Sequence, residues 1–326
     1  MTVPNSLDND GLGAATPVVS VSPVVLAAPG RGEALLVRVS APTTGTSLPV
    51  VVFSHGFGWS ADSYAPLVNF WASHGFVVVQ PTHLDARTRA LPPQDPRTPD
   101  IWRSRIKDLR SCVDHLELVE AAVPGLTGRV DSSRLAVAGH SWGGQSASTL
   151  LGARVLDPAG RPGEDMFDPR VRAGVLLSTT GSGGADLSPF AAEHFPFMSP
   201  SFSTLTTPTL VVAGDQDDSP LSTRGPDWFT DIYTKGPGAD TLLTLFGAQH
   251  SLGGIAGHAV AETTDEHPER VALIQRLTTA YLRDVLCPGD TTWSAVAGAL
   301  QEATDPMGRL DTKGRPGAPA GVDATA

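Results

Sequence analysis

The stretch Leu135-Ala136-Val137-Ala138-Gly139-His140-Ser141-Trp142-Gly143-Gly144 decides the fold. A short apolar run leads into the pattern Gly-x-Ser-x-Gly, and a helix-like segment follows it. This order predicts a sharp turn between a strand and a helix, a nucleophile elbow, with Ser141 at its tip. Gly139 and Gly143 suit such a turn because it is too tight for Cβ atoms and glycine tolerates a strained backbone. We therefore expect the Ser141 hydroxyl to stand at the end of a sheet, within reach of a substrate.

Apolar runs and amphipathic segments alternate on both sides of this elbow. The continuous apolar run 50–53 is typical of a strand buried on both faces, and further strands are predicted at 76–79, 135–138, 174–177, 210–213 and 242–246. Apolar residues at helical spacing lie between several of these runs, as at Trp102, Ile106, Leu109 and Val113. The alternation predicts an α/β fold with a mostly parallel central sheet and helices on both faces.

The ends of the chain differ from its middle. Residues 17–25 and 33–39, separated by a Gly/Pro turn, predict an N-terminal antiparallel hairpin at the edge of the sheet. We expect residues 1–16 to form a flexible lead, residues 17–303 a single α/β domain, and the Gly/Pro/Ala-rich residues 304–326 a disordered tail. Within the domain, residues 179–207 predict a long loop that could cap the site, because loops of this length are usually functional.

Composition limits the class of protein. Of the 326 residues 40% are hydrophobic, which allows a sizeable core and excludes global disorder. The 34 acidic residues outnumber the 23 basic ones, and Lys and Arg form no cluster, so nucleic acid is not an expected partner. No apolar run is long enough to predict a transmembrane segment. The first residues show no signal peptide, which predicts a cytoplasmic location. If a signal peptide had been removed from the sequence, a secreted location would be the alternative.

Two cysteines, Cys112 and Cys287, are too few to indicate a disulfide framework. We expect two unrelated thiols. A disulfide between them stays open, because separation along the chain says nothing about geometry. The sequence does not indicate the oligomeric state.

A serine hydroxyl is a poor nucleophile at neutral pH and needs a base, which in turn needs an orienting group. After an elbow of this kind the acid comes next in the chain and the base last. His250 follows the last apolar run and precedes the closing helix, so it is the preferred base. His258 and His267, which lie further along the chain, are the alternatives.

The acid is expected directly after the apolar run 210–213, where the sequence reads Gly214-Asp215-Gln216-Asp217-Asp218. Asp217 has the frequent Gly-x-x-Asp spacing and is the preferred acid, with Asp218 as the alternative. The carboxylates that are not used are expected to belong to a solvated acidic turn.

An oxyanion hole needs two backbone N–H groups aimed at the developing negative charge. One should come from Trp142, the residue after the nucleophile. The other should come from the loop 54–58 that follows the first buried strand, and the Phe57 amide is the expected donor. His55 in this loop is expected to fix the loop by hydrogen bonds rather than to take part in the chemistry.

Aromatic residues near these positions predict an apolar pocket. Phe57, Trp59 and Trp142 are expected to line it, and five residues of the long loop are expected to cover it: Phe190, Phe195, Phe197, Met198 and Phe202. The alternative for these five is ordinary packing of the loop onto the domain. Such a pocket favours a small-molecule or lipid-like ester that is neutral and hydrophobic.

Metal ions and cofactors are not expected. His83 and Asp85 lack a third partner at metal-ligand spacing, and a hydrated loop accounts for the carboxylates of residues 157–168. The glycines of residues 56–58 lack the rest of a dinucleotide-binding fingerprint.

These motifs resemble the α/β-hydrolase superfamily, and within it the dienelactone-hydrolase-like branch, which includes chlorophyllases, platelet-activating-factor acetylhydrolase-like enzymes and cutinases that degrade polyesters. The resemblance covers roughly Glu33 to Pro288, and four segments carry it: 53–58 (FSHGFG), 72–79 (ASHGFVVV), 139–144 (GHSWGG) and 208–214 (PTLVVAG). It implies hydrolysis of carboxylic esters through an acyl-enzyme, without a cofactor. The chain departs from dienelactone hydrolases, which have Cys in place of Ser141. At the position of Trp142, chlorophyllases typically have Arg and polyester hydrolases Met.

Together the residues and the resemblance predict a serine carboxylic-ester hydrolase. Ser141 would be the nucleophile, His250 the base and Asp217 the orienting acid. Two alternatives stay open: an acyltransferase or thioesterase on the same scaffold, and a binding protein of this fold without catalytic activity.

Overall fold

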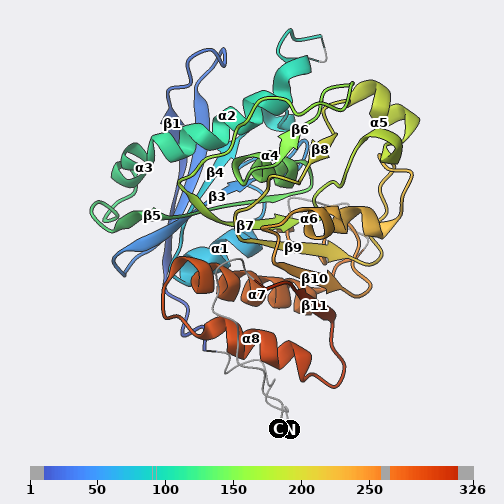
Figure 1. The fold of residues 1–326 in the computed structure, drawn as a ribbon. Helices are drawn as coiled ribbons and strands as arrows, with labels where there is room; N and C mark the ends of the chain where they lie inside the picture. The colour runs from blue at the N-terminus through green and yellow to red at the C-terminus, as the bar shows by residue number, and fades with distance from the viewer. Residues whose placement is uncertain (1–10, 90, 93, 258–264, 315–326) are drawn as a thin grey trace.

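A nine-stranded sheet runs through the computed structural model, which describes residues 11–89, 91–92, 94–257 and 265–314 (Figure 1). Its strand order is β1-β2-β4-β3-β5-β7-β9-β10-β11. The strands are β1 (Val18–Leu26), β2 (Leu35–Pro42), β3 (Leu48–Ser54), β4 (Val77–Thr82), β5 (Val130–His140), β7 (Val171–Leu177), β9 (Thr209–Gly214), β10 (Thr241–Leu245) and β11 (Gly308–Thr312). The short strands β6 (Arg154–Val155) and β8 (Pro200–Ser201) pair separately.

The sheet is parallel in its centre and antiparallel at its two edges. β1 and β2 form a hairpin, and β2 also runs antiparallel to β4. From β4 through β3, β5, β7 and β9 to β10, each strand is parallel to its neighbour. All residues of β3 and β9 are buried, as expected for apolar strands covered on both faces. The predicted α/β fold, with its mostly parallel sheet and N-terminal hairpin, is confirmed.

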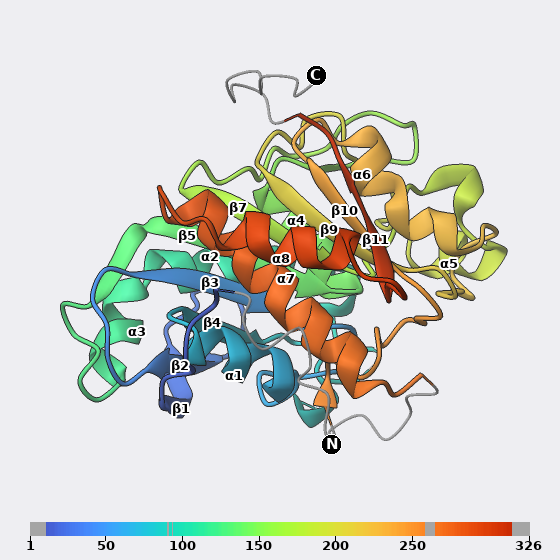
Figure 2. The same ribbon diagram turned by 90° about the horizontal axis from the view of Figure 1, so that it is seen from below.

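Helices cover both faces of the sheet (Figures 1 and 2). Apolar residues of α2, α3, α4 and α6 belong to one core cluster, and those of α1, α7 and α8 belong to the other, on the opposite face. The helices are α1 (Ala65–Ser73), α2 (Ile101–Asp114), α3 (Leu116–Ala122), α4 (Trp142–Leu150), α5 (Pro189–His194), α6 (Asp231–Lys235), α7 (Pro268–Leu286) and α8 (Thr292–Gln301).

Both predicted chain ends need correction. In the expected lead, Leu12 is buried and its carbonyl accepts a hydrogen bond from Arg283 (2.9 Å), so residues 11–16 pack on the domain. In the expected tail, β11 pairs antiparallel with β10 and Leu310 packs against the core. A Gly/Pro-rich composition hides this strand, because backbone pairing with a distant segment leaves no local pattern. The rest of both expected segments, residues 1–10 and 315–326, lies outside the described residues.

The elbow requires glycine because two backbones meet there. A Cβ atom on Gly143, in the first turn of α4, would lie 2.1 Å from the carbonyl oxygen of Ser54 and 2.5 Å from that of His55. A Cβ on Gly139 would lie 2.4 Å from the carbonyl group of Gly143. The start of α4 is thereby seated directly on the end of β3.

We therefore expect Gly143→Ala to lower the free energy of unfolding by about 3 kcal/mol, since neither backbone can move aside without strain. Gly298→Ala is the matched control, because a Cβ at that helical position meets no atom within 4 Å. The control should be neutral or should stabilise by up to about 1 kcal/mol. Urea unfolding of the two variants measures both effects, and equal stabilities would contradict this account of the elbow.

Candidate active site

The ends of the parallel strands bring three residues from distant parts of the chain together. Ser141 follows β5, Asp217 follows β9 and His250 follows β10. His250 Nε2 lies 2.8 Å from Ser141 Oγ. His250 Nδ1 lies 3.0 and 3.1 Å from the two carboxylate oxygens of Asp217. Asp217 is fully buried, whereas the imidazole of His250 is 43% exposed.

These contacts set the proton positions on His250. A carboxylate only accepts hydrogen bonds, so Nδ1 carries the hydrogen and donates it to Asp217. Nε2 then presents its lone pair to the Ser141 hydroxyl. A histidine held in this form can take a proton from the serine, and the neighbouring carboxylate can stabilise the resulting cation. Asp218, the alternative acid, is exposed and does not contact His250 through any hydrogen bond of the described residues.

The loop that carries His250 is anchored from behind. The Asp265 carboxylate accepts hydrogen bonds from the backbone N–H groups of Gln249 (2.8 Å) and Gly253 (3.0 Å). His267 Nδ1 accepts a hydrogen bond from the Arg270 amide and caps α7, which gives this alternative base a structural role. His258, the other alternative, lies outside the described residues.

Ser141 has the backbone conformation of a strained elbow. Its φ of 55° and ψ of −125° are rare for a residue with a side chain. The Ser141 N–H donates to the Leu177 carbonyl (2.9 Å), and the Ser141 carbonyl accepts from the Gly144 amide (2.9 Å). The strain is held by these contacts on both sides, and it turns the hydroxyl toward His250.

Two backbone amides near Ser141 are available to an oxyanion. They belong to Trp142, the first residue of α4, and to Phe57, in the loop after β3. Neither donates a hydrogen bond to another residue in the described part of the chain. The rings of these two residues lie 5.5 Å apart and border the same pocket.

This pocket has a volume of about 440 Å³ and opens beside Ser141. Phe195, Phe197 and Met198 line it, with Thr180, Leu221, the Asp218–Pro220 turn and the residues already described. Two expected lining residues lie elsewhere. The Trp59 ring packs against the core with Arg87 over it, and Phe190 is exposed on α5, stacked on His194. Phe202 belongs to the core. The direction of a loop side chain has no sequence signature, which explains these errors.

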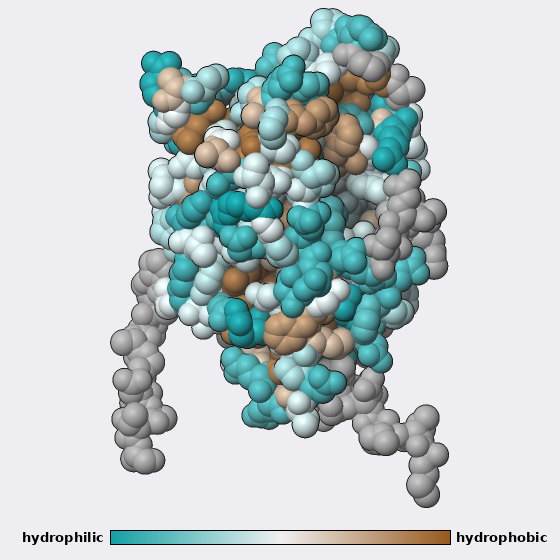
Figure 3. Space-filling model, turned by 90° about the vertical axis from the view of Figure 1, so that its right-hand side faces the viewer, coloured by the Kyte–Doolittle hydropathy of each residue, from teal (hydrophilic) through white to brown (hydrophobic). Residues whose placement is uncertain are grey.

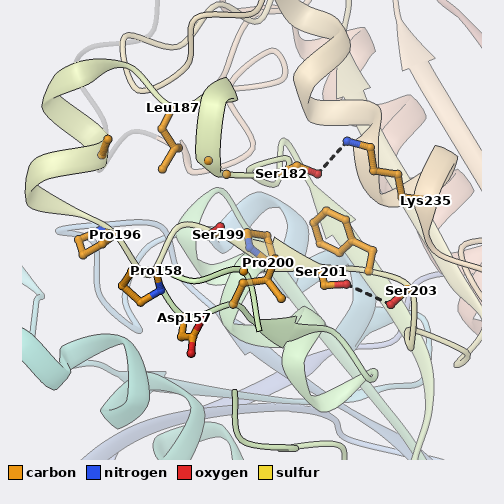
Figure 4. Close-up of a pocket in the computed structure, with 16 residues that line it drawn as sticks. Asp157, Pro158, Ser182, Leu187, Pro196, Ser199, Pro200, Ser201, Ser203 and Lys235 are labelled. Carbon is orange, nitrogen blue, oxygen red and sulfur yellow. Dashed lines mark hydrogen bonds between the residues drawn. The ribbon is translucent and has the colours of Figure 1, made fainter. Parts of the chain in front are cut away.

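The segment 195–200 has a cavity on each side. Pro196, Ser199 and Pro200 border a second cavity of about 580 Å³, shown in Figure 4, where Lys235 donates a hydrogen bond to Ser182 Oγ (2.8 Å). The Phe197 carbonyl accepts a hydrogen bond from Gln145 (2.9 Å), which fixes the segment to α4.

Figure 3 views the side of the molecule that carries α5, and hydrophobic residues gather on the upper part of that face.

Comparison with known proteins gives a consistent result. The family model "Chlorophyllase" matches residues 18–155. Cutinase 1 of Thermobifida cellulosilytica is 26% identical over 252 residues, which are 76% of each chain. Cutinase est1 of Thermobifida alba is 26% identical over 77% of this chain and 68% of its own. Chlorophyllase type 0 of Chenopodium album is 34% identical over 113 residues, 34% of this chain and 31% of its own.

The chain belongs to the α/β-hydrolase superfamily. Its similarity to cutinases and chlorophyllases identifies it as a serine ester hydrolase. Cys112 and Cys287 of this hydrolase are free thiols. Among the helices of its described residues, none combines the length and apolar character needed to cross a bilayer.

A buried ion pair, which sequence reasoning missed, holds the loop after β3. Arg105 of α2 binds both carboxylate oxygens of Asp85 at 2.6 and 2.7 Å, and Asp85 in turn accepts the Gly58 amide (3.2 Å). The Arg105 guanidinium also donates to the His55 carbonyl and lies 4.9 Å from the Trp142 ring centroid. Burial opposes ionisation of Asp85, but Arg105 outweighs it and the pKa of the carboxyl is lowered. One signal existed: Arg105 is a charge on the apolar face of a helix.

A second Ser–His–Asp arrangement lies in the interior of the hydrolase. Ser54 Oγ is 2.9 Å from His83 Nε2, and His83 Nδ1 is 2.9 Å from Asp108, which Arg31 also binds (2.8 Å). All four residues are buried. His55 acts in the same region as expected: its Nε2 accepts the His83 amide (3.0 Å) and its Nδ1 donates to the Gly56 carbonyl (2.7 Å). The arrangement ties three segments together and has no route to a substrate.

Three buried histidines give the hydrolase a predicted acid sensitivity. Burial lowers the pKa of His55 and His83 far below the usual value. Burial, together with repulsion from the protonated form of His250, lowers the pKa of His140 to about 3. A depressed histidine pKa stabilises the fold fully above pH ~6.5, and this stability is lost as the pH falls toward the folded pKa. Asp108, whose pKa burial raises to about 6, acts in the opposite direction.

We expect His140→Gln to reduce this acid sensitivity. Each histidine contributes up to about 1.4 kcal/mol per pH unit below pH ~6.5. Between pH 6 and pH 5 the free energy of unfolding should therefore fall by about 1 kcal/mol less in the variant than in the unaltered hydrolase. Urea unfolding at both pH values tests this, and because His55, His83 and Asp108 are common to both proteins their contributions cancel. Equal losses would show that His140 is already protonated in the folded state.

Proposed function

We propose that this hydrolase cleaves neutral, hydrophobic carboxylic esters through a covalent acyl-enzyme on Ser141. The single observation that supports this most is the continuous set of hydrogen bonds from Ser141 Oγ through His250 to the buried Asp217. It joins a nucleophile, a base and an orienting carboxylate in the order that acyl transfer requires.

In the proposed mechanism Ser141 Oγ attacks the ester carbonyl carbon while His250 Nε2 takes the hydroxyl proton. The carbonyl oxygen becomes an oxyanion and receives hydrogen bonds from the Phe57 and Trp142 amides. When the tetrahedral intermediate collapses, the bond to the alkoxy oxygen breaks and His250 returns the proton to the leaving alcohol. Water, deprotonated by His250, then releases the carboxylic acid and restores Ser141. Asp217 holds the imidazole and stabilises its cationic form throughout.

The pocket supports the proposed substrate class. Its lining is mainly aromatic and aliphatic, from Phe57, Trp142, Phe195, Phe197 and Met198. Among the described residues of the lining, Asp218 at the exposed turn is the one ionisable side chain besides the His250 imidazole. Burial of apolar surface would therefore supply most of the binding free energy, and a carboxylate or phosphate on the substrate would meet no cation there.

The exposed imidazole favours water as the acceptor. With 43% of its surface open, His250 can be reached by solvent without displacement of a lid. This favours hydrolysis over an acyltransferase, which has to exclude water from its acyl-enzyme. Partition of the acyl group between water and an added alcohol separates the two, and the same assay with thioesters tests the thioesterase alternative.

We expect Ser141→Ala to lower kcat for short, neutral aryl esters by at least about a thousandfold. A fluorophosphonate should label the unaltered hydrolase at one site, and this labelling should be lost in the variant. Ser203→Ala, which changes an exposed serine outside the pocket, is the control and should keep both properties. Ester turnover by Ser141→Ala at the unaltered rate would refute the proposed function. Absence of labelling and turnover in the unaltered chain would favour a binding protein.

The neighbouring carboxylates Asp217 and Asp218 should respond differently to amide replacement. Asp217→Asn should lower kcat by at least about a hundredfold, because an asparagine can stabilise the wrong histidine tautomer and cannot stabilise its cation. Asp218→Asn should leave kcat for neutral esters within about threefold, and this variant is the matched control. Steady-state kinetics on the same ester compare them. A large loss confined to Asp218→Asn would identify the other carboxylate as the acid.

A further inference from the structure

His140, the residue before the nucleophile, has no part in the mechanism above, yet it is buried against the site. The residue is only 5% exposed, and its ring centroid lies 5.0 Å from that of His250. His140 Nε2 is 2.8 Å from the backbone carbonyl oxygen of His250. His140 Nδ1 is 2.8 Å from the hydroxyl of Tyr64.

Tyr64 extends this contact to the loop after β3. The residue is fully buried, and its hydroxyl oxygen lies 3.0 Å from the backbone nitrogen of Gly56. Gly56 directly precedes Phe57, whose amide is the proposed oxyanion donor. The Tyr64 backbone N–H also donates to the carbonyl of Ala256 (3.1 Å), in the loop that carries His250.

The chemistry of the end groups gives this chain of hydrogen bonds one direction. The Gly56 amide can only donate, so the Tyr64 oxygen accepts its hydrogen and turns its own proton toward His140 Nδ1. Nδ1 is then an acceptor, which places the His140 hydrogen on Nε2, from which it is donated to the His250 carbonyl. No other proton arrangement satisfies all four groups. Protonation of His140 would place a second donor against the Tyr64 hydroxyl, and the burial of the ring opposes that charge.

We propose that Tyr64 and His140 are positioning residues that fix the oxyanion loop and the His250 loop at one distance through this directional chain. The inference rests on the proposed function of Ser141 and His250. The two loops leave the sheet from β3 and β10, which are separated by β5, β7 and β9. His140, at the end of β5, lies between them and can hold both. Neither residue touches the reacting atoms, so their effect is on geometry alone.

Three variants separate hydrogen bonding from shape. His140→Phe keeps a ring of similar size without either hydrogen bond. His140→Gln keeps one acceptor and one donor without the ring. Tyr64→Phe removes only the hydroxyl. We expect His140→Phe and Tyr64→Phe to lower kcat by about 10- to 100-fold with KM within about threefold, since small displacements of catalytic groups have effects of this size. His140→Gln should recover kcat to within about fivefold of the unaltered hydrolase.

A second readout does not depend on the choice of ester. The rate of fluorophosphonate labelling at Ser141 uses the same nucleophile and oxyanion contacts, so it should fall in parallel with kcat. Tyr233→Phe, a tyrosine outside the pocket, is the control for loss of a hydroxyl and should change neither rate more than twofold. Thermal unfolding shows whether each variant is folded at the assay temperature, and if His140→Phe is not, Tyr64→Phe decides.

Two results would overturn the inference. One is a folded His140→Phe or Tyr64→Phe variant with kcat and labelling rate within twofold of the unaltered hydrolase. The other is an equal loss in His140→Gln and His140→Phe, because ring shape rather than hydrogen bonding would then matter. Failure of the proposed function looks different: Ser141→Ala would retain ester turnover whatever happens at position 140.

Discussion

The close approach of two backbones at Gly143 is the constraint on which the rest of the site depends. The first turn of α4 rests directly on the carbonyl groups of Ser54 and His55, at a separation that leaves no room for any side chain. This contact places the Ser141 elbow and the loop after β3 against each other. The positions of the Phe57 and Trp142 amides, the proposed oxyanion donors, therefore depend on backbone packing, which resists displacement more strongly than contacts between flexible side chains.

Buried polar groups then hold the loops around this contact. Arg105, Asp85 and the His55 carbonyl form one cluster, and Ser54, His83 and Asp108 form another beneath it. Taking these groups out of water opposes folding, and only close pairing offsets that effect. A displaced loop would leave these buried groups without their partners, which opposes its movement. Burial lowers the pKa of His55 and His83 and so favours their neutral forms in the interior.

The sequence predicts the parts of this structure that have a local pattern. Apolar runs such as 50–53 and 210–213 identify strands buried on both faces. Chain order and the Gly-x-x-Asp spacing favour His250 and Asp217 over their alternatives, and the structure brings both to Ser141. Contacts such as Tyr64 with His140, 76 positions apart, have no such pattern. For the same reason the sequence did not predict β11, which pairs with β10 through backbone hydrogen bonds. The prediction that Trp59 and Phe190 line the pocket was wrong for a related reason. Hydrophobicity indicates whether a side chain is buried, but not which cavity or core it faces.

The two Ser–His–Asp arrangements have similar internal geometry but different surroundings. Their hydrogen-bond distances are nearly the same, at 2.8 Å between serine and histidine in one and 2.9 Å in the other. Ser54, however, lies in a regular strand, and His83 is completely enclosed. Ser141 stands on a strained turn with φ at 55°, beside a pocket and a histidine that solvent can reach. Hydrogen-bond distances within the three residues therefore do not distinguish the proposed catalytic set from the buried one. The proposed nucleophile borders a pocket and lies near two unused amides, Trp142 of the elbow and Phe57 of the loop after β3, whereas Ser54 is enclosed within its strand.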